Sequence, residues 1–452
     1  MVLMLVAGIL ALTVRGGGHA AAVPYPCGLA PCRAAFTKVP TRGFEGAYVT
    51  ADPKDPQHVI VVDTDLLAAK CGWHTTYDGG KTWIDGVFEL PAGYTSCRIN
   101  PPSGGHVPSG SVAFGLYGKV YAVFGSASAA NQGRESVLMV SSLDGGTTFL
   151  PAKVAVAPQP GYGLARPLMI VARGASGTDE LLLSFWGCHQ ISAGTQCDEA
   201  LFSKSDDGGD NFSPGVLVNK PPGGQNPSQP AIGPNGALYM TFQRRYTDHV
   251  DLFLATSRDA GITWNESKID TENQIGLQYD PAKLVVDPKS GALYTVWADT
   301  RTGSPQIFFR KSTDKGMTWS NAALLTPDST GVNGGSRDPS IDIAPNGRID
   351  VAYYYTAPEM PTDDEVYLDS SIDGGVTFSV RQVNPKPINR TLGYSGSINS
   401  LGEVGNQYPP EVASLNGAAY VVWSDTANAT KVTETQDVDM RELLFSGTTP
   451  KA

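Results

Sequence analysis

Clustered positive charge is what this sequence of 452 residues lacks most clearly. It has 33 Lys and Arg residues against 44 Asp and Glu residues, which gives a formal net charge of −11. Proteins that bind nucleic acid or anionic lipid use dense patches of Lys and Arg. We therefore expect neither nucleic acid nor a membrane surface as a partner.

Long apolar runs are scarce as well. The clearest run, Met1–Val14, is shorter than the roughly 20 apolar residues that a membrane-spanning helix needs, and it is followed by Arg15 and the small residues Ala20–Ala22. Such a run before small residues is typical of a secretory signal peptide. We interpret residues 1–22 as a signal peptide and expect a secreted, extracellular or periplasmic protein with no membrane insertion.

Cysteine is also rare. The six residues are Cys27, Cys32, Cys71, Cys97, Cys188 and Cys197. No Cys-x-x-Cys pair occurs and no His lies at ligand spacing to another His or to these cysteines, so we predict no zinc site and assign no metal-ligating residue. Six cysteines in an exported chain favour disulfides over buried free thiols, and pairing between neighbours (27 to 32, 71 to 97, 188 to 197) closes the shortest loops.

Glycine and proline, in contrast, are abundant. The chain has 51 Gly and 33 Pro, with 41% hydrophobic and 17% charged residues. This composition is typical of many short strands joined by tight turns. It predicts an all-β fold.

One motif recurs six times. The copies cover residues 76–83 (TYDGGKTW), 142–149 (SLDGGTTF), 205–212 (SDDGGDNF), 257–264 (SRDAGITW), 312–319 (STDKGMTW) and 371–378 (SIDGGVTF). Consecutive aspartates are 52 to 66 residues apart, which is enough for one four-stranded sheet. In a hairpin turn, Gly supplies positive φ, the Asp carboxylate accepts turn N–H groups and the closing aromatic residue packs inward. We predict that these aspartates stabilise turns and take no part in catalysis.

A second repeat raises the number of units to seven. It is a short strand, a turn with Gly and an aromatic-rich strand, and its last copy, ending in Ala419–Trp423, has no motif after it. Repeats of this kind predict a β-propeller, here with seven four-stranded antiparallel blades. Only one further strand follows, so we expect Ala34–Val39 to complete the last blade. The predicted divisions are an N-terminal segment at 23–40, the propeller at 41–446 and a tail at 447–452.

The six motifs resemble the Asp boxes of the sialidase-like superfamily of BNR-repeat proteins, over nearly all of residues 41–446. The resemblance implies the propeller fold, which in that superfamily includes both enzymes and noncatalytic proteins. Its catalytic members, typically six-bladed, bind the sugar carboxylate with three arginines and use a Tyr nucleophile paired with Glu and an Asp acid/base. The nearest match here to their Phe/Tyr-Arg-Ile-Pro element is Cys97–Pro101, in which Asn100 separates Ile99 from the proline and which lies in the second unit.

Candidate site residues gather where each blade begins. A ring of residues, each followed by Pro, precedes the first strand of five blades: Arg166, Gln229, Asp280, Asp338 and Tyr408. In a propeller this end of the blades carries the channel mouth. We predict carboxylate binding by Arg98, Arg166, Arg245, Arg301 and Arg337. Acid/base chemistry is predicted for Asp280 or Asp338, and nucleophile chemistry for Tyr408 or Glu403. The alternative is that these residues only line a water-filled channel and form hydrogen bonds with the ends of strands.

Three functions fit this pattern. The first is a sialidase-like glycoside hydrolase, the second is a noncatalytic propeller that binds a glycan or a protein, and the third is a polysaccharide lyase using a loop base such as His189 or Tyr246. Each of these functions, except the binding of a protein, predicts a glycan or a small carboxylate-bearing molecule as the ligand. No cofactor is predicted, although a structural calcium ion stays open, and the sequence does not indicate an oligomeric state.

Overall fold

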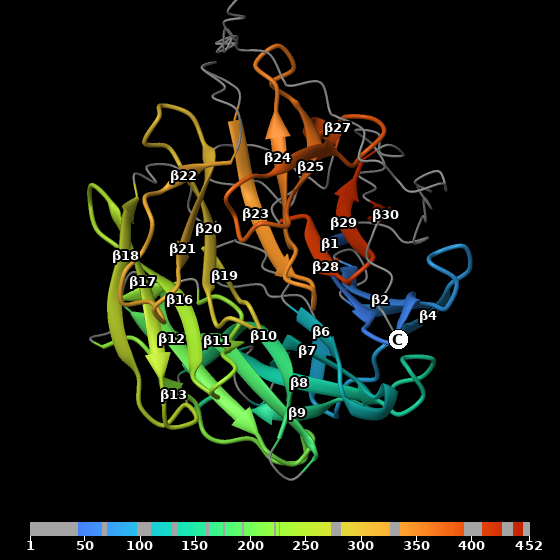
Figure 1. Ribbon diagram of the computed structural model, residues 1–452. Coiled ribbons are helices and arrows are strands. Elements are labelled where there is room, and N and C mark those ends of the chain that lie inside the picture. The colour runs from blue at the N-terminus through green and yellow to red at the C-terminus, as the bar shows by residue number, and fades with distance from the viewer. Residues whose placement is uncertain are drawn as a thin grey trace, which may run out of the picture.

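The computed structural model describes most of residues 44–445. The longest internal stretches outside this description are 97–109, 273–281, 326–334, 393–408 and 427–436, with shorter ones in several turns. The described residues form seven antiparallel sheets, arranged as blades around one axis, and no α-helix (Figure 1). The prediction of an all-β, seven-bladed propeller is confirmed.

The blades follow one another along the chain, each with its first strand nearest the axis. Blade 1 consists of β1 (Phe44–Asp52), β2 (Asp55–Asp65), β3 (Lys70–Thr76) and β4 (Ile84–Val87). Blade 2 consists of β5 (Tyr94–Ser96), β6 (Gly110–Phe114), β7 (Val120–Ser128), β8 (Glu135–Ser142) and β9 (Lys153–Val156). Blade 3 consists of β10 (Tyr162–Arg173), β11 (Asp179–Ile191), β12 (Gly194–Ser205) and β13 (Val216–Leu217).

Blades 4 to 7 continue in the same sense. Blade 4 consists of β14 (Gly224–Gln225), β15 (Ala231–Ile232), β16 (Leu238–Arg245), β17 (Val250–Ser257) and β18 (Asn265–Glu272), and blade 5 consists of β19 (Lys283–Val286), β20 (Leu293–Asp299), β21 (Gln306–Ser312) and β22 (Ala323–Leu324). Blade 6 consists of β23 (Gly335–Ile343), β24 (Ile349–Thr356), β25 (Asp363–Ser371), β26 (Ser379–Gln382) and β27 (Ile388–Asn389). Blade 7 consists of β28 (Glu411–Ser414), β29 (Ala418–Asp425) and β30 (Asp437–Leu444).

The ring closes between blades 7 and 1, where β1 lies beside β28 and β29 (Figure 1). Blade 7 has three strands among the described residues. The segment predicted to complete it, Ala34–Val39, lies outside the described residues, as do the predicted signal peptide and the tail.

An apolar core fills each boundary between neighbouring blades. Successive residues of a strand face opposite sides: in β29, Tyr420 and Val422 pack toward blade 1, whereas Val421 and Trp423 pack toward blade 6. Strands buried on both faces need continuous apolar sequence. This is why the second strand of each blade shows as an aromatic-rich run in the sequence.

The repeated motif forms the turn between the third and fourth strands. In the fourth copy, the Thr263 N–H donates to Asp259 Oδ1 (2.9 Å) and the Ser257 hydroxyl donates to the same carboxylate (2.8 Å). Gly261 has a φ of 87°, which L side chains rarely adopt. The buried ring of Trp264 packs 5.2 Å from Phe202 of the preceding blade. Each turn therefore ties one blade to its neighbour.

Replacing Asp259 with alanine is expected to lower the melting temperature by a few degrees and leave ligand binding unchanged. Hydrogen bonds from Thr263 and Ser257 lower the pKa of Asp259 from 3.8 to about 2. Because the folded-state pKa is lowered, the stabilisation is present above pH 3.8 and is lost as the pH falls toward 2. Thermal melts across this range test the prediction, with Ile262→Ser, an exposed position of the same turn, as the control. Loss of binding with unchanged stability would contradict it.

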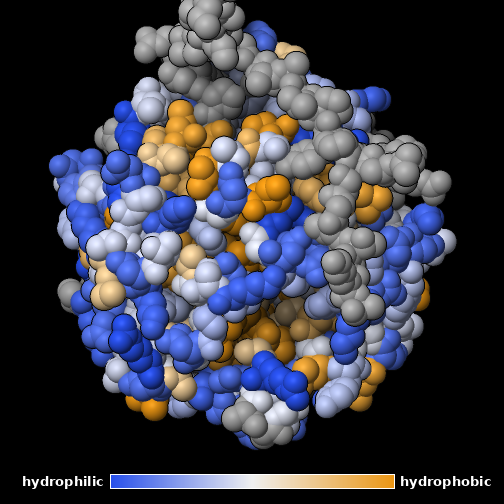
Figure 2. Space-filling model, in the orientation of Figure 1, coloured by the Kyte–Doolittle hydropathy of each residue, from blue (hydrophilic) through white to orange (hydrophobic). Residues whose placement is uncertain are grey.

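These turns define the two faces of the ring. Because all blades run in the same sense, every motif turn lies at one end, here called the motif face. The first strands begin at the opposite end, here called the mouth face. Figure 2 shows that the face in view is hollowed near its middle, where apolar side chains lie in the recess beside β6, β7 and β10.

Candidate functional site

Two predicted site residues have a strained backbone. Arg166 in β10 and Asp338 in β23 both have a φ of 52°, and each lies in a β-bulge directly before a proline. A positive φ is costly for most side chains, although Asn and Asp adopt it more readily than others, and such strain concentrates at functional sites. Bulges also redirect a side chain out of the regular alternation of a strand. Of the three ring positions that the structure describes, Arg166, Gln229 and Asp338, the first and the last have this strained backbone.

Arg166 belongs to a polar cluster on the channel side of the blades. Its guanidinium carbon lies 4.7 Å from the centre of the Trp186 ring. Burial raises the pKa of Tyr48 in β1, Glu411 in β28 raises it further, and Arg166 acts to lower it. Tyr48 of blade 1 therefore lies near both Arg166 of blade 3 and Glu411 of blade 7.

Lys283 completes this cluster from blade 5. Its ammonium lies 3.7 Å from the carboxylate of Glu411, with the two side chains 13% and 17% exposed. Burial raises the pKa of Glu411, and Lys283 opposes the rise. Since blades 5 and 7 are not neighbours, this ion pair must reach across the channel. We define Tyr48, Arg166, Lys283 and Glu411 as the channel cluster.

Sequence reasoning missed three members of the channel cluster. Lys283 and Glu411 each stand three residues after a predicted ring residue, Asp280 and Tyr408. Their constant spacing from a residue that is followed by proline is the sequence signal that could have identified Lys283 and Glu411 as site residues. Tyr48 has no proline before it and no comparable signal.

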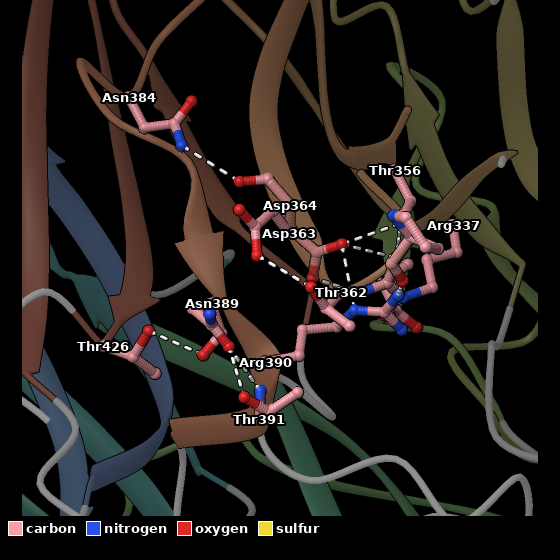
Figure 3. A network of polar contacts seen from close by, with 12 residues as sticks. Arg337, Thr356, Thr362, Asp363, Asp364, Asn384, Asn389, Arg390, Thr391 and Thr426 are labelled. Atoms are coloured by element: carbon pink, nitrogen blue, oxygen red, sulfur yellow. Dashed lines mark hydrogen bonds and ion pairs between the residues drawn. The ribbon is translucent and has the colours of Figure 1, made fainter. Parts of the chain in front are cut away.

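Arg337 lies between the carboxylates of Asp338 and Asp364, and Figure 3 shows its contact with Asp364. It donates two hydrogen bonds to the fully buried Asp364, one of them 3.1 Å long, and its Nε lies 3.5 Å from Asp338. Arg390 approaches Asp364 from the other side at 3.4 Å, and the Thr356 hydroxyl donates to it at 2.7 Å. The structure therefore brings Arg337 and Asp338 together, and it anchors Arg337 to its own blade.

The other two predicted arginines that the structure describes, Arg245 and Arg301, lie elsewhere on the mouth face. Arg301 donates to the buried Asp299 at 2.8 Å and lies 3.4 Å from Asp270. Arg245 ends β16 opposite Val250. Arg301 and Arg337 thus contact different carboxylates on different blades.

Several predicted residues lie outside the described part of the chain. They are Arg98, Asp280, Glu403, Tyr408, Cys27, Cys32 and Cys97. The predicted disulfide between Cys188 and Cys197 is present. Cys71 is also disulfide-bonded.

A small cavity lies behind the channel cluster between blades 1 and 2. It has a volume of about 10 Å³ and is lined by Tyr48, Asp63, Cys71 and Phe124, among others. This is room for about one water molecule, so the cavity does not accept a sugar. In the described part of the chain no three His, Cys, Asp or Glu side chains gather as a metal site, and no helix there could cross a membrane.

Comparison with known proteins supports the fold and does not identify a specific activity. No protein-family model matches the chain, and no curated protein matches its sequence. An ulvan lyase, which is a polysaccharide lyase, shares 11% identity over 91% of this chain and 96% of its own, with a TM-score of 0.55. A protein of unknown function from Dyadobacter fermentans shares 14% identity over 79% and 97%, with a TM-score of 0.53. A Hadza microbial sialidase shares 12% over 87% and 74%, with a TM-score of 0.49.

Proposed function

We propose that this protein is an extracellular carbohydrate-active propeller of the sialidase-like, Asp-box type, which binds a carboxylate-bearing glycan at its channel mouth. The observation that carries the proposal is the pair of strained bulges at Arg166 and Asp338. Strain of this kind persists only where the surrounding structure imposes it, and it re-aims the side chains that it carries. The Cys188–Cys197 disulfide supports the oxidising compartment that the proposed signal peptide implies.

Arg166 is the proposed carboxylate contact. Its guanidinium over the Trp186 ring offers a planar pair of donors beside an aromatic surface, and arginine binds carboxylates through two parallel hydrogen bonds. Arg98, Arg245, Arg301 and Arg337 remain proposed as further contacts. Asp280, Asp338, Glu403 and Tyr408 remain proposed for cleavage chemistry. Neither set includes the channel cluster residues Lys283 and Glu411, which neutralise each other.

Replacing Arg166 with glycine is expected to weaken glycan binding about tenfold to a hundredfold, because a hydrogen bond to a charged group contributes about 1.5–3 kcal/mol. Stability should hold, since glycine adopts the φ of 52° without strain and so offsets the lost contact with Trp186. Calorimetric titration with uronate-containing oligosaccharides, and with their carboxyl-reduced forms, measures both effects alongside a thermal melt.

Arg258→Ala is the matched control, because Arg258 is an exposed arginine on the motif face. The proposal fails if Arg166→Gly binds like the unchanged protein, or if carboxyl-reduced glycans bind equally well. Binding without any cleavage product would favour the noncatalytic alternative. Asp338→Asn, which keeps a side chain that tolerates positive φ, separates binding from hydrolysis in the same assay.

A further inference from the structure

A pair of opposite charges spans the channel. Lys283 begins β19 of blade 5, and Glu411 begins β28 of blade 7. Each stands three residues after a ring position that is followed by proline, and the residues at the same spacing in blades 3, 4 and 6 are apolar, namely Met169, Ile232 and Ile341. The repeat therefore carries charge at this position only in the two blades whose side chains meet.

The contact between the two charges is an ion pair without a hydrogen bond. The Lys283 ammonium lies 3.7 Å from Glu411 Oε1, whereas a hydrogen bond from an ammonium to a carboxylate is about 2.7–2.9 Å long. Within the described part of the chain, this buried oxygen accepts no hydrogen bond. Burying two charges costs free energy that only a close, hydrogen-bonded geometry offsets. Glu411 therefore holds Lys283 weakly compared with a carboxylate that could approach the ammonium closely.

The other charged and titratable groups near Glu411 come from two further blades. Tyr48 of blade 1 lies near Glu411 and also near Arg166 of blade 3, which is the proposed carboxylate contact. Burial raises the pKa of Tyr48, so its hydroxyl stays protonated and adds no charge. A ligand carboxylate that binds Arg166 thus enters the same cluster as the Glu411 carboxylate, and both negative charges are attracted to the Lys283 ammonium.

We propose that Glu411 is an internal substitute for the ligand carboxylate. In the free protein Glu411 occupies the Lys283 ammonium, and in the complex a carboxylate of the glycan takes its place. Lys283 is thus a second cationic contact besides Arg166. Glu411 makes the site selective, because a neutral glycan has no charge with which to displace it. This inference rests on the proposed function, since it concerns the carboxylate that is proposed to enter at the channel mouth.

Displacement of Glu411 is coupled to the uptake of a proton. Burial raises the pKa of Glu411, and Lys283 is the group that opposes this rise. When the ligand carboxylate takes the ammonium, Glu411 loses that opposing charge and gains a like charge beside it, so its pKa rises further. The carboxyl group then takes a proton from the solvent. Binding should therefore strengthen as the pH falls from neutral toward the pKa of Glu411 in the free protein.

Blade 3 offers a matched control pair. Lys204 Nζ lies 3.8 Å from the Glu180 carboxylate, and the two side chains are 22% and 20% exposed. Burial raises the pKa of Glu180 as well. Lys204 lies near the end of β12 and Glu180 near the start of β11, so this pair lies toward the motif face. Its length and burial match those of the channel pair, whereas its place is at the opposite end of the blades.

Calorimetric titration of the full chain with galacturonate and glucuronate oligosaccharides, and with their carboxyl-reduced forms, tests the inference. Glu411→Gln should bind the carboxylated forms about tenfold more tightly, because a site that must first release Lys283 loses affinity in proportion to the fraction that is competent. Lys283→Met should weaken their binding about tenfold or more, because it removes a charged contact. Glu180→Gln should bind like the unchanged protein.

Stability and proton uptake are readouts that a purely structural ion pair would not move in the same way. Without ligand, Glu411→Gln should melt at a lower temperature, because it leaves the largely buried Lys283 ammonium without its anion, and yet it should bind more tightly. Titrations in two buffers of different ionisation enthalpy should show that the unchanged protein takes up a proton on binding and that Glu411→Gln does not. If Glu411→Gln does not fold, the double variant Glu411→Gln with Lys283→Met, which buries neither charge, should likewise bind without proton uptake.

The outcomes separate the inference from the proposed function. If carboxylated oligosaccharides bind the unchanged protein but bind Glu411→Gln equally or less tightly, the inference is wrong and the proposed function stands. Binding to the unchanged protein without proton uptake, or an equal gain in affinity for Glu180→Gln, would also overturn the inference alone. If none of the variants and not even the unchanged protein binds a carboxylated oligosaccharide, the proposed function is wrong and the inference falls with it.

Discussion

Replacing Asp364 with alanine is expected to destabilise the propeller by about 3–5 kcal/mol. Asp364 is fully buried, accepts hydrogen bonds from Arg337 and Thr356, and forms an ion pair with Arg390 at 3.4 Å (Figure 3). The side chains of Arg337 and Arg390 are only 15% and 9% exposed. Without Asp364, two guanidinium groups remain charged in a place that water barely reaches, which is the costly case for a buried ion pair.

The free energy of unfolding from urea denaturation measures this effect. Asp363→Ala is the control, because the neighbouring carboxylate bonds to Thr362 on an exposed part of the surface and should change stability by about 0.5 kcal/mol or less. Equal effects for the two variants would show that the Arg337–Asp364–Arg390 network does not hold the mouth face of blade 6 together.

The sequence predicts the fold well because the signals that define it are local. Four of the six motif copies read Asp-Gly-Gly, and both glycines adopt positive φ in the turn. The other two copies place Ala260 and Lys315 at the first of these positions with φ values of 57° and 65°. The turn is thus imposed by its Asp, Ser and aromatic residues even where the preferred glycine is missing. Because several residues of the motif each favour the same turn, its copies can be counted along the chain without knowledge of any distant contact.

The channel cluster could not be predicted in the same way. Lys283 and Glu411 are separated in the chain by an entire blade and meet only because the ring brings them to opposite sides of one channel. Tyr48 joins them from blade 1 through closure of the ring. No local pattern marks such a contact, so the number and radius of the blades must be known first.

Arg337 shows a second limit of sequence reasoning. Its place before the pre-proline Asp338 predicts a ligand contact, and the structure does place it at the mouth face. Its nearest carboxylate, however, is Asp364 on the third strand of the same blade. In the sequence, Asp363 and Asp364 are an unremarkable acidic pair after a turn. The alternation of β25 leaves Asp363 partly exposed and buries Asp364, and this makes Asp364 the partner of two arginines.

Loss of the imidazole of His74 is the second large effect that we expect. His74 lies in β3 between two carboxylates: its Nε2 is 3.1 Å from Asp63 and its Nδ1 is 2.7 Å from Asp85. Its side chain is 4% exposed and that of Asp63 is fully buried. A neutral imidazole has one N–H donor, whereas the imidazolium has two. The geometry therefore requires the charged form.

The pKa of His74 agrees with this geometry. Burial acts to lower the pKa, but the charge and hydrogen bonds of Asp63 and Asp85 outweigh it and raise the value from 6.5 to about 9. A raised folded-state pKa means that the stabilisation is complete below pH 6.5 and is lost as the pH rises through 9. The shift corresponds to about 3 kcal/mol, at 1.36 kcal/mol per pKa unit.

His74→Gln is accordingly expected to cost about 3–5 kcal/mol at neutral pH, because it leaves Asp63 buried without a cation. The difference from the unchanged protein should shrink above pH 9, where the unchanged protein has lost its imidazolium as well. Urea denaturation below pH 6.5 and above pH 9 measures both quantities. Asp63→Asn combined with His74→Gln should recover part of the loss, since a neutral amide pair no longer buries a charge. A His74→Gln penalty that is the same on both sides of this pH range would mean that His74 contributes its packing and hydrogen bonds without its charge.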